Sequence, residues 1–383
     1  MEPEAVISPS SPVASVALVV GVTGMAGLSL AQALRSPTAL GGHWKVYGAA
    51  RRPMPSWFPF SAVDHYINFD AADLNDTRRH LSPISADVTH LFWVALQVRD
   101  SEESNTAVNR SMLSNVLHVL GSAPDARLRH VTLQTGTKHY MGPIFDPTHS
   151  ASLAHVPPDP PFREDSPRLP FPNFYYALED LLASHAPRLT YSVHRASIIL
   201  GASSRSAYNT LLTLAVYAAV CRLEGLPFRF PGTRYTWEHF CDATDVRVLA
   251  EQHVWAAVTE EAKNQAFNCT NGDVFTWKSM WKVLSEVFGV GYVPYEEGEE
   301  FDIVGLMEGK GKVWDAIVEE HGLYPTRLEE ITCFGALKHV LHFEFQHVSS
   351  MNKSRDFGFF GHADSLKSIG PWVETLRQMK IIP

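Results

Sequence analysis

Apolar runs alternate with segments of helical spacing along the first half of the chain. Six runs are rich in apolar residues, and most of them end in glycines or charged residues, which is typical of buried strands: 16–27, 44–53, 65–73, 89–96, 129–136 and 191–201. Between them, residues 28–36 and 104–123 carry apolar residues at helical spacing. Strands that are apolar on both faces and alternate with helices predict an α/β fold with a doubly wound parallel sheet.

The second half of the chain has a different pattern. We expect 1–14 to be a flexible lead, 15–201 to form the nucleotide-binding lobe, and 202–383 to form mainly a smaller, mostly helical substrate-binding lobe. Residues 240–285 contain a strand, a turn and a helix that we expect to rejoin the sheet. The proline-rich segment 141–172 is too long for an ordinary connection, which indicates an active-site loop.

Composition and charge exclude several classes of protein. The chain has 383 residues, is 45% hydrophobic and carries a net charge of −9, which argues against a general nucleic-acid binder. We find no apolar run of about 18 residues and no apolar core of a secretory signal near the first residue, so we expect a cytoplasmic protein without a membrane span. The cysteines show no CxxC spacing and the histidines no HxH or HExxH spacing, so we expect no metal site.

Three glycines follow the first predicted strand directly. Gly21, Gly24 and Gly27 have the spacing GxxGxxG between a strand and a helix. At such a turn the first glycine permits the tight bend, the second admits a pyrophosphate close to the backbone, and the third lets helix and sheet pack closely. This placement predicts a dinucleotide site, and a purely structural turn is the alternative.

The end of the second predicted strand indicates which dinucleotide binds. An NAD site places an acidic residue there to hold the ribose hydroxyls, whereas this chain has Arg51 and Arg52. A guanidinium matches a 2′-phosphate in charge and in geometry, so we expect NADPH. Two solvated surface arginines are the alternative. We expect Asp70 and Ala71, after the third strand, to lie near the adenine.

The stretch FYYALED raises a question about acid–base chemistry. Many nicotinamide-dependent reductases have a lysine four residues after a catalytic tyrosine, but here Glu179 follows Tyr175 and Asp180 follows Tyr176 at that distance. The chemistry requires proximity in space only. Lys138, just after the fifth predicted strand, lies at the sheet edge where ligands of such folds bind, and from there it could reach the same point as Tyr175 from the opposite side.

Seven segments together carry a specific resemblance. The chain resembles the plant progesterone 5β-reductase/iridoid synthase-like family of atypical extended short-chain dehydrogenases from about residue 15 to 383, through GVTGMAG, VYGAARRP, LQTGTKHYMGP, PNFYYALED, SVHRASIILG, FNCTNGDVFTWKSMWKVLSEVFG and SSMNKSRDFGF. In that family the lysine stands in TGxKHY and the tyrosine directly follows NF. The resemblance therefore assigns the catalytic pair to Lys138 and Tyr175.

The resemblance also implies an activity. It implies NADPH-dependent reduction of the C=C bond of an α,β-unsaturated carbonyl compound, with hydride added to the β-carbon. Tyr175 would stabilise the developing enolate oxygen, while Lys138 would anchor the ribose and keep the local charge positive. The expected partner is a small hydrophobic enone or enal: a 3-oxo-Δ4-steroid such as progesterone, or alternatively 8-oxogeranial, which would be reduced and cyclised.

We expect two sets of site residues. The substrate set is Leu96, Tyr140, Phe343 and Phe345, where Leu96 replaces a tryptophan that many relatives carry. The expected cofactor contacts are Gly21, Thr23, Gly24, Met25, Gly27, Arg51, Arg52, Asp70, Ala71, Ala95, Thr135, Gly136, Lys138, Tyr175, Ala196 and Ile198, where Ala196 and Ser197 replace the Pro-Gly or Pro-Ala of relatives.

Two rival functions remain open. A carbonyl-reducing or epimerising extended dehydrogenase would normally carry YxxxK, which is absent at Tyr175. A dinucleotide-sensing regulator without catalysis would have no reason to keep both Lys138 and Tyr175. The sequence leaves the oligomeric state open, a homodimer included.

Overall fold

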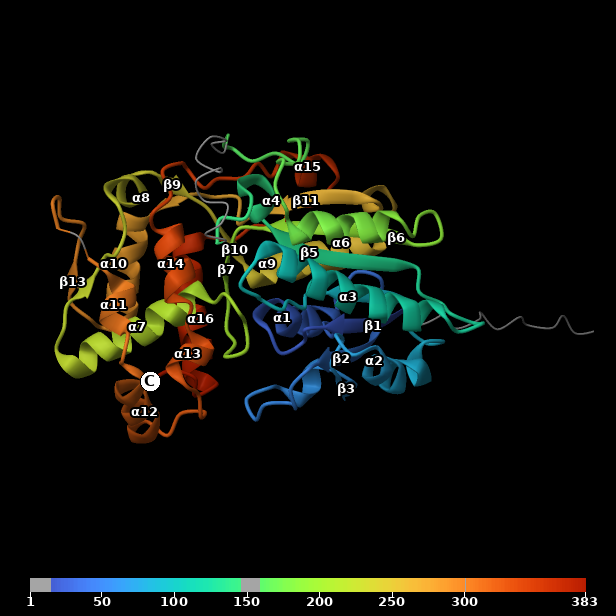
Figure 1. Ribbon diagram of the computed structural model, residues 1–383, viewed down its shortest axis with the longest axis horizontal. Coiled ribbons are helices and arrows are strands. Elements are labelled where there is room, and N and C mark those ends of the chain that lie inside the picture. The colour runs from blue at the N-terminus through green and yellow to red at the C-terminus, as the bar shows by residue number, and fades with distance from the viewer. Residues whose placement is uncertain (1–14, 146–158, 300) are drawn as a thin grey trace, which may run out of the picture.

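The computed structural model describes residues 15–145, 159–299 and 301–383. The expected flexible lead, 1–14, and the middle of the expected active-site loop lie outside the described residues. Figure 1 shows a part built around a sheet on the right and a helical part on the left.

The sheet part is built on seven parallel strands in the order β11-β6-β5-β4-β1-β2-β3. From β1 the chain moves outward to β3, returns to β4 on the other side of β1, and then moves outward to β11. This order confirms the predicted doubly wound fold. The strands are β1 (Ser15–Val20), β2 (Trp44–Ala50), β3 (His65–Asn68), β4 (His90–Trp93), β5 (His130–Gly136), β6 (Thr190–Ala196) and β11 (Gln265–Cys269).

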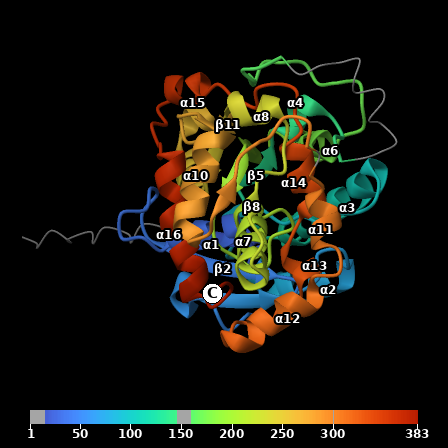
Figure 2. The ribbon, with the colours of Figure 1, turned by 90° about the vertical axis from the view of Figure 1, so that its left-hand side faces the viewer.

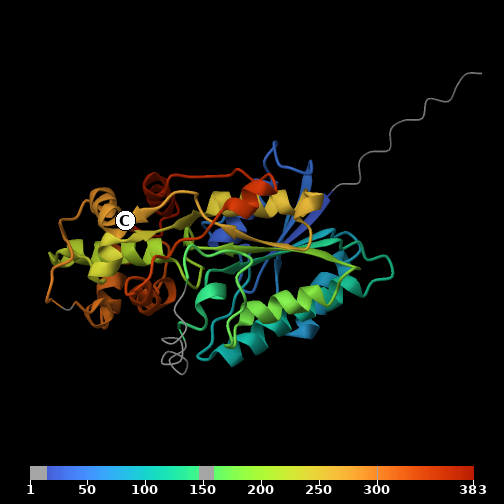
Figure 3. The same ribbon diagram turned by 90° about the horizontal axis from the view of Figure 1, so that it is seen from above.

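Helices cover both faces of this sheet, as Figure 3 shows from above. Side chains of β1 alternate between the two faces: Leu18 packs among residues of α3 and α6, and Val19 packs among residues of α1 and α9. Both faces of the strand are therefore buried, which explains its unbroken apolar sequence. The covering helices are α1 (Met25–Leu34) and α9 (Val246–Val258) on one face, and α2 (Leu74–Leu81), α3 (Glu102–Gly121) and α6 (Phe174–Ala183) on the other.

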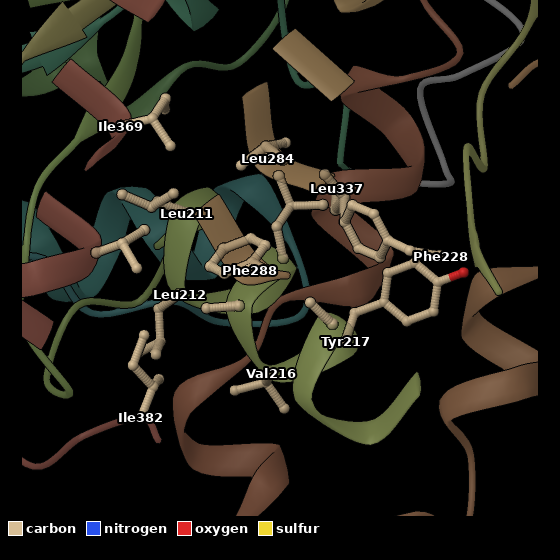
Figure 4. Packing of buried hydrophobic residues seen from close by; sticks show 14 of the residues in the cluster. Leu211, Leu212, Val216, Tyr217, Phe228, Leu284, Phe288, Leu337, Ile369 and Ile382 are labelled. Carbon is tan, nitrogen blue, oxygen red and sulfur yellow. The ribbon is translucent and has the colours of Figure 1, made fainter. Parts of the chain in front are cut away.

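The helical part has its own apolar core around α7 (Thr210–Glu224), which lies among its neighbouring helices in Figure 2. Figure 4 shows Leu212 and Val216 of α7 in this core together with Phe228 and Leu284. The other helices of this part are α8 (Arg234–Glu238), α10 (Trp277–Phe288), α11 (Ile303–Met307), α12 (Gly311–Glu320), α13 (Leu328–Ile331), α14 (Phe334–Val340) and α16 (Ser365–Gln378).

The sixth predicted strand is interrupted at Ser197. The backbone N–H of Ser197 donates to Thr244 Oγ1 at 2.9 Å, and its hydroxyl donates to Asp242 Oδ1 at 2.5 Å. These bonds draw the chain out of the main sheet after β6. The following strand, β7 (Ile198–Leu200), pairs with β10 (Ala243–Asp245) instead.

Another boundary differs from the sequence pattern. The fourth strand ends at Trp93, so Leu96 lies beyond it in irregular structure. Part of the segment 240–285, which we expected to rejoin the sheet, belongs to the sheet part, because α9 packs on the sheet and β11 pairs with β6. In the described part of the chain, no helix has both the length and the apolar character that a membrane span requires.

We predict that the free energy of unfolding falls as the pH decreases from about 6.5 toward 4. Burial lowers the pKa of His90 and His194 to about 4 and that of His130 to about 3. The unfolded chain protonates histidines near pH 6.5, so unfolding takes up protons in this window, at about 1.4 kcal/mol per pH unit for each proton. Burial raises the pKa of Asp242 to about 7, and this carboxyl acts in the opposite direction between about pH 4 and 7. Burial also raises the pKa of Glu164 and Glu251, which act in the same direction as Asp242.

Urea unfolding at several pH values between 7.5 and 5 measures this slope. His194→Gln should flatten it, because that variant removes one buried histidine, whereas His43→Gln at an exposed position should leave it unchanged. Stability that stays constant or rises as the pH falls from 6.5 to 5 would contradict the prediction.

Candidate active site

A cavity of about 340 Å³ opens at the carboxyl edge of the sheet, beside the switch point between β1 and β4. Ligands of doubly wound sheets bind at this place, and the volume is within the usual range for small-molecule sites. Every residue that we expected at the cofactor lines the cavity: Gly21, Thr23, Gly24, Met25, Gly27, Arg51, Arg52, Asp70, Ala71, Ala95, Thr135, Gly136, Lys138, Tyr175, Ala196 and Ile198.

The glycine loop forms a cradle that only glycine backbone permits. Gly21 has a φ of +99°, and a Cβ on Gly27 would lie 2.2 Å from the Gly21 carbonyl oxygen. Helix α1 begins after Gly24 with no side-chain cap, so N–H groups of its first turn face the cavity without a partner from their own helix. One of them, the N–H of Met25, donates to Ser206 Oγ at 2.9 Å. This cradle fits a pyrophosphate.

The backbone that carries the two arginines is fixed by neighbouring side chains. Asn68 Nδ2 donates to the carbonyl oxygen of Arg51 at 2.8 Å, and the Tyr66 hydroxyl donates to that of Arg52 at 2.6 Å. Both bonds come from β3 and hold the end of β2. Both arginines line the cavity.

A third arginine, Arg205, lines the cavity from the segment after β7. It donates to the carbonyl oxygen of Pro53 at 2.7 Å and to the Tyr324 hydroxyl at 3.3 Å. Burial, and then the charges of Arg205 and Arg51, lower the pKa of Arg52. Like charges held this close favour an anionic ligand. Sequence reasoning missed Arg205 because it lies far along the chain from the glycine loop and in no recognised motif.

Tyr175 and Lys138 both reach the cavity, as expected. Helix α6 begins after Asn173, whose side-chain oxygen accepts from the Tyr175 N–H at 3.0 Å. The Tyr175 hydroxyl lies 3.3 Å from the position that a Cβ on Gly136 would occupy, so the phenol packs over the end of β5. The Lys138 ammonium lies 5.1 Å from the centre of the Tyr175 ring.

The charge near Tyr175 differs from our expectation. Lys138 Nζ donates to Glu102 Oε1 at 2.6 Å as part of a buried ion pair, so the positive charge that we expected beside the phenol is largely balanced. Burial, with smaller effects of Tyr208 and Glu102, raises the pKa of Tyr175. The phenol therefore stays protonated at neutral pH and can act as a hydrogen-bond donor.

Sequence reasoning also missed a set of hydrogen-bonded polar side chains on the cavity wall. Thr137 Oγ1 bonds His347 Nε2 at 2.8 Å, and His347 Nδ1 faces Ser197 Oγ at 3.4 Å and Asp242 Oδ1 at 3.8 Å. Burial lowers the pKa of His347 to about 4, so the ring is neutral at pH 7. Thr137, Ser197 and His347 line the cavity. Their meeting depends on contacts between distant segments, for which the sequence offers no local signal.

The expected substrate residues divide into two groups. Leu96 and Phe343 line the cavity, and Leu96 remains 36% exposed. Phe345 is outside the cavity lining in the described parts of the chain and stacks behind Phe343, with ring centres 4.7 Å apart. The apolar wall is completed by residues that sequence reasoning did not select: Met141, Ile144, Phe145, Tyr208, Cys333, Ala336 and Val340.

Tyr140, which we expected to contact substrate, is not among the described residues that line the cavity. Its hydroxyl donates to Asn268 Oδ1 at 2.6 Å and accepts from Arg195 at 3.1 Å, and its ring stacks on Phe162 at 5.0 Å. These contacts hold Tyr140 away from the cavity, because α4 (Lys138–Met141) directs its successive side chains to different sides. Among the residues that the structure describes, no cluster of histidine, cysteine or acidic side chains could hold a metal ion.

The doubly wound sheet, the glycine cradle and the phenol–ammonium pair define a Rossmann-type oxidoreductase. The chain belongs to the family of the PRISE-like Rossmann-fold domain, whose model matches residues 38–383. It is an oxidoreductase that uses a nicotinamide cofactor.

Curated relatives cover nearly the whole chain. The 3-oxo-Delta(4,5)-steroid 5-beta-reductase of Arabidopsis thaliana is 46% identical over 98% of this chain and 95% of its own length. The (S)-8-oxocitronellyl enol synthase of Catharanthus roseus is 43% identical over 96% of this chain and 92% of its own length. Among solved structures, the UDP-glucose 4-epimerase of Thermus thermophilus in complex with NAD superposes with a TM-score of 0.60 at 15% identity, over 94% of this chain and 99% of that one. The last comparison shows the fold alone.

We predict that Gly27→Ala destabilises the protein and weakens nicotinamide cofactor binding. The added Cβ would lie 2.2 Å from the Gly21 carbonyl oxygen and 2.6 Å from the Val22 Cα, so the cradle must shift. Overpacking of this kind costs about 1–3 kcal/mol. Thermal unfolding and NADPH fluorescence titration measure the two effects. Gly121→Ala is the matched control, because a Cβ there meets nothing within 4 Å. Cofactor binding that is equal in both variants would show that the cradle does not hold the cofactor.

Proposed function

We propose that this chain is an NADPH-dependent enone reductase that reduces the C=C bond of a hydrophobic α,β-unsaturated carbonyl compound. The observation that carries the proposal is the position of the Tyr175 hydroxyl, which lies over Gly136 in a cavity with an apolar wall. The names of the curated relatives support the same chemistry. We favour a 3-oxo-Δ4-steroid as substrate. We keep 8-oxogeranial as the alternative, because the steroid reductase and the enol synthases have nearly equal identity to this chain.

The residues of the site suit this reaction. NADPH, when bound on the glycine cradle, supplies a hydride. Tyr175 donates a hydrogen bond to the carbonyl oxygen, where negative charge develops as the β-carbon accepts the hydride. A positioned donor of this kind contributes roughly 3–4 kcal/mol to the transition state. Lys138 holds the ribose side of the site, and apolar residues such as Met141 and Phe343 exclude water from the reacting carbons.

NADPH is favoured over NADH by the positive charge of three arginines. Arg51, Arg52 and Arg205 all line the cavity, and burial, together with the charges of Arg205 and Arg51, lowers the pKa of Arg52. A 2′-phosphate would relieve this repulsion through charge-assisted hydrogen bonds. The proposal also keeps the cytoplasmic location, the small-molecule partner and an open oligomeric state as predictions.

We predict enone-dependent NADPH oxidation that is lost in Tyr175→Phe. The assay uses progesterone, 8-oxogeranial and 2-cyclohexen-1-one, and the products are identified by mass and chirality. Removing one oxyanion donor should lower kcat about 100- to 1,000-fold. Tyr191→Phe, which removes a hydroxyl outside the cavity lining, should retain the kcat of the wild type.

The assay can reject the proposal in two ways. A product reduced at the carbonyl carbon would favour the rival carbonyl reductase. If Tyr208→Phe lost more activity than Tyr175→Phe, the donor would be the other tyrosine of the cavity.

We predict that Arg52→Ala and Arg205→Ala each raise the KM for NADPH about 10- to 100-fold, because a hydrogen bond to a charged group is worth about 1.5–3 kcal/mol. The KM for NADH should change far less, since NADH lacks the 2′-phosphate. Steady-state kinetics with both cofactors measure the ratio, and Arg222→Ala, at an exposed position on α7, is the control. Equal effects on both cofactors would mean that the arginines do not recognise the phosphate.

A further inference from the structure

The catalytic pair that we propose comes from two separate segments. In a YxxxK reductase, the tyrosine and the lysine lie on one helix, whose geometry fixes their separation. Here Lys138 begins α4 and Tyr175 lies in the first turn of α6. No shared helix sets the distance between the phenol and the ammonium group, so other contacts must do so.

One buried carboxylate joins the two segments. Glu102, in the first turn of α3, is only 3% exposed. Its Oε1 accepts from Lys138 Nζ at 2.6 Å and from the backbone N–H of Phe174 at 2.7 Å. Phe174 is the residue directly before Tyr175. The same oxygen atom therefore contacts the end of the lysine side chain and the first residue of the tyrosine helix, through two short charge-assisted hydrogen bonds.

A second side chain ties the backbones of these segments together. Asn173 Nδ2 donates to the Lys138 carbonyl oxygen at 3.1 Å, while its Oδ1 accepts from the Tyr175 N–H at 3.0 Å. Asn173 thus fixes where the lysine backbone meets α6, and Glu102 fixes where the lysine side chain ends. The Lys138 ammonium also lies over the Phe174 ring, 4.1 Å from its centre. This is the position in which a cation is attracted by the face of an aromatic ring.

We propose that Glu102 is a positioning residue that sets the separation of Lys138 and Tyr175, in place of the helix that carries both in a YxxxK reductase. This inference rests on the proposed function and deepens it. Buried ion pairs are weak sources of net stability, so stability alone does not account for this one. A carboxylate that contacts both catalytic segments at once accounts for its buried position beside Lys138 and Phe174.

Three variants test the positioning role. Glu102→Gln keeps the size of the side chain and an oxygen for the Phe174 N–H, but it removes the ion pair. Glu102→Asp keeps the charge and withdraws it by one methylene. Glu103→Gln is the matched control, because Glu103 is exposed in the same turn of α3. We expect Glu102→Gln to lower kcat about 10- to 100-fold, the range found for displacements of about 1 Å, and Glu103→Gln to stay near the wild type.

Thermal unfolding separates positioning from a purely structural role. We expect Glu102→Asp to recover most of the melting temperature that Glu102→Gln loses, but to remain well below the wild type in kcat. If kcat instead follows the melting temperature through both variants, Glu102 supports only the fold and the proposal is overturned. If Glu102→Gln does not fold, Glu102→Asp alone still decides: a normal kcat at normal stability rejects the role.

A double-mutant cycle with Lys138→Met gives the sharpest answer. The ion pair is already broken in that background, so Glu102→Gln should lower kcat much less there than in the wild type. Equal fold-losses in both backgrounds would show that Glu102 acts independently of Lys138. The same cycle is measured on the dissociation constant for NADPH, because Lys138 lines the cofactor cavity. If the wild type turns over no enone, the proposed function fails. In that case the cycle on the NADPH dissociation constant still tests the positioning role: non-additive effects of the two substitutions support the role, and additive effects reject it.

Discussion

The parallel pairing of β4 between β1 and β5 is the constraint on which the rest of the site depends. The chain leaves β1 toward β2 and leaves β4 toward β5, so a crevice opens where these two directions part. Residues at the carboxyl ends of several strands face this crevice: Gly21 after β1, Arg51 after β2, Ala95 after β4 and Gly136 at the end of β5. Side chains that are far apart in the sequence meet there because all these strands end at the same edge.

Charge within the crevice is arranged in two separate regions. At the β2 end, Arg51, Arg52 and Arg205 concentrate positive charge where a phosphate is expected. At the β5 end, Glu102 balances Lys138, and burial keeps the Tyr175 phenol protonated. The first region suits binding of an anion, and the second suits hydrogen-bond donation to an oxygen that becomes negative during the reaction. A deprotonated phenol could not play the second role, because it has no proton to donate.

The sequence predicted those parts of the site that follow directly from a strand end. The glycine loop, the arginine pair and Lys138 each stand within a few residues of an apolar run, so the strand pattern alone places them at the sheet edge. Tyr140 belongs to the same segment as Lys138, but the short helix α4 directs its side chain toward Asn268, outside the described lining of the cavity. Glu102, Arg205 and His347 were missed because their roles arise from contacts between distant segments. Nothing in the acidic pair Glu102–Glu103 shows which carboxylate is buried.

The break after β6 has the same kind of cause, since Ser197 is drawn away by Thr244 and Asp242, which lie more than forty residues later in the chain. The proposed reaction depends on where the substrate oxygen contacts the protein. A crystal structure with NADP⁺ and a bound enone measures this directly. We expect the carbonyl oxygen within about 2.6–3.2 Å of the Tyr175 hydroxyl. A carbonyl oxygen directed away from Tyr175, or bound to another side chain, would contradict the central claim.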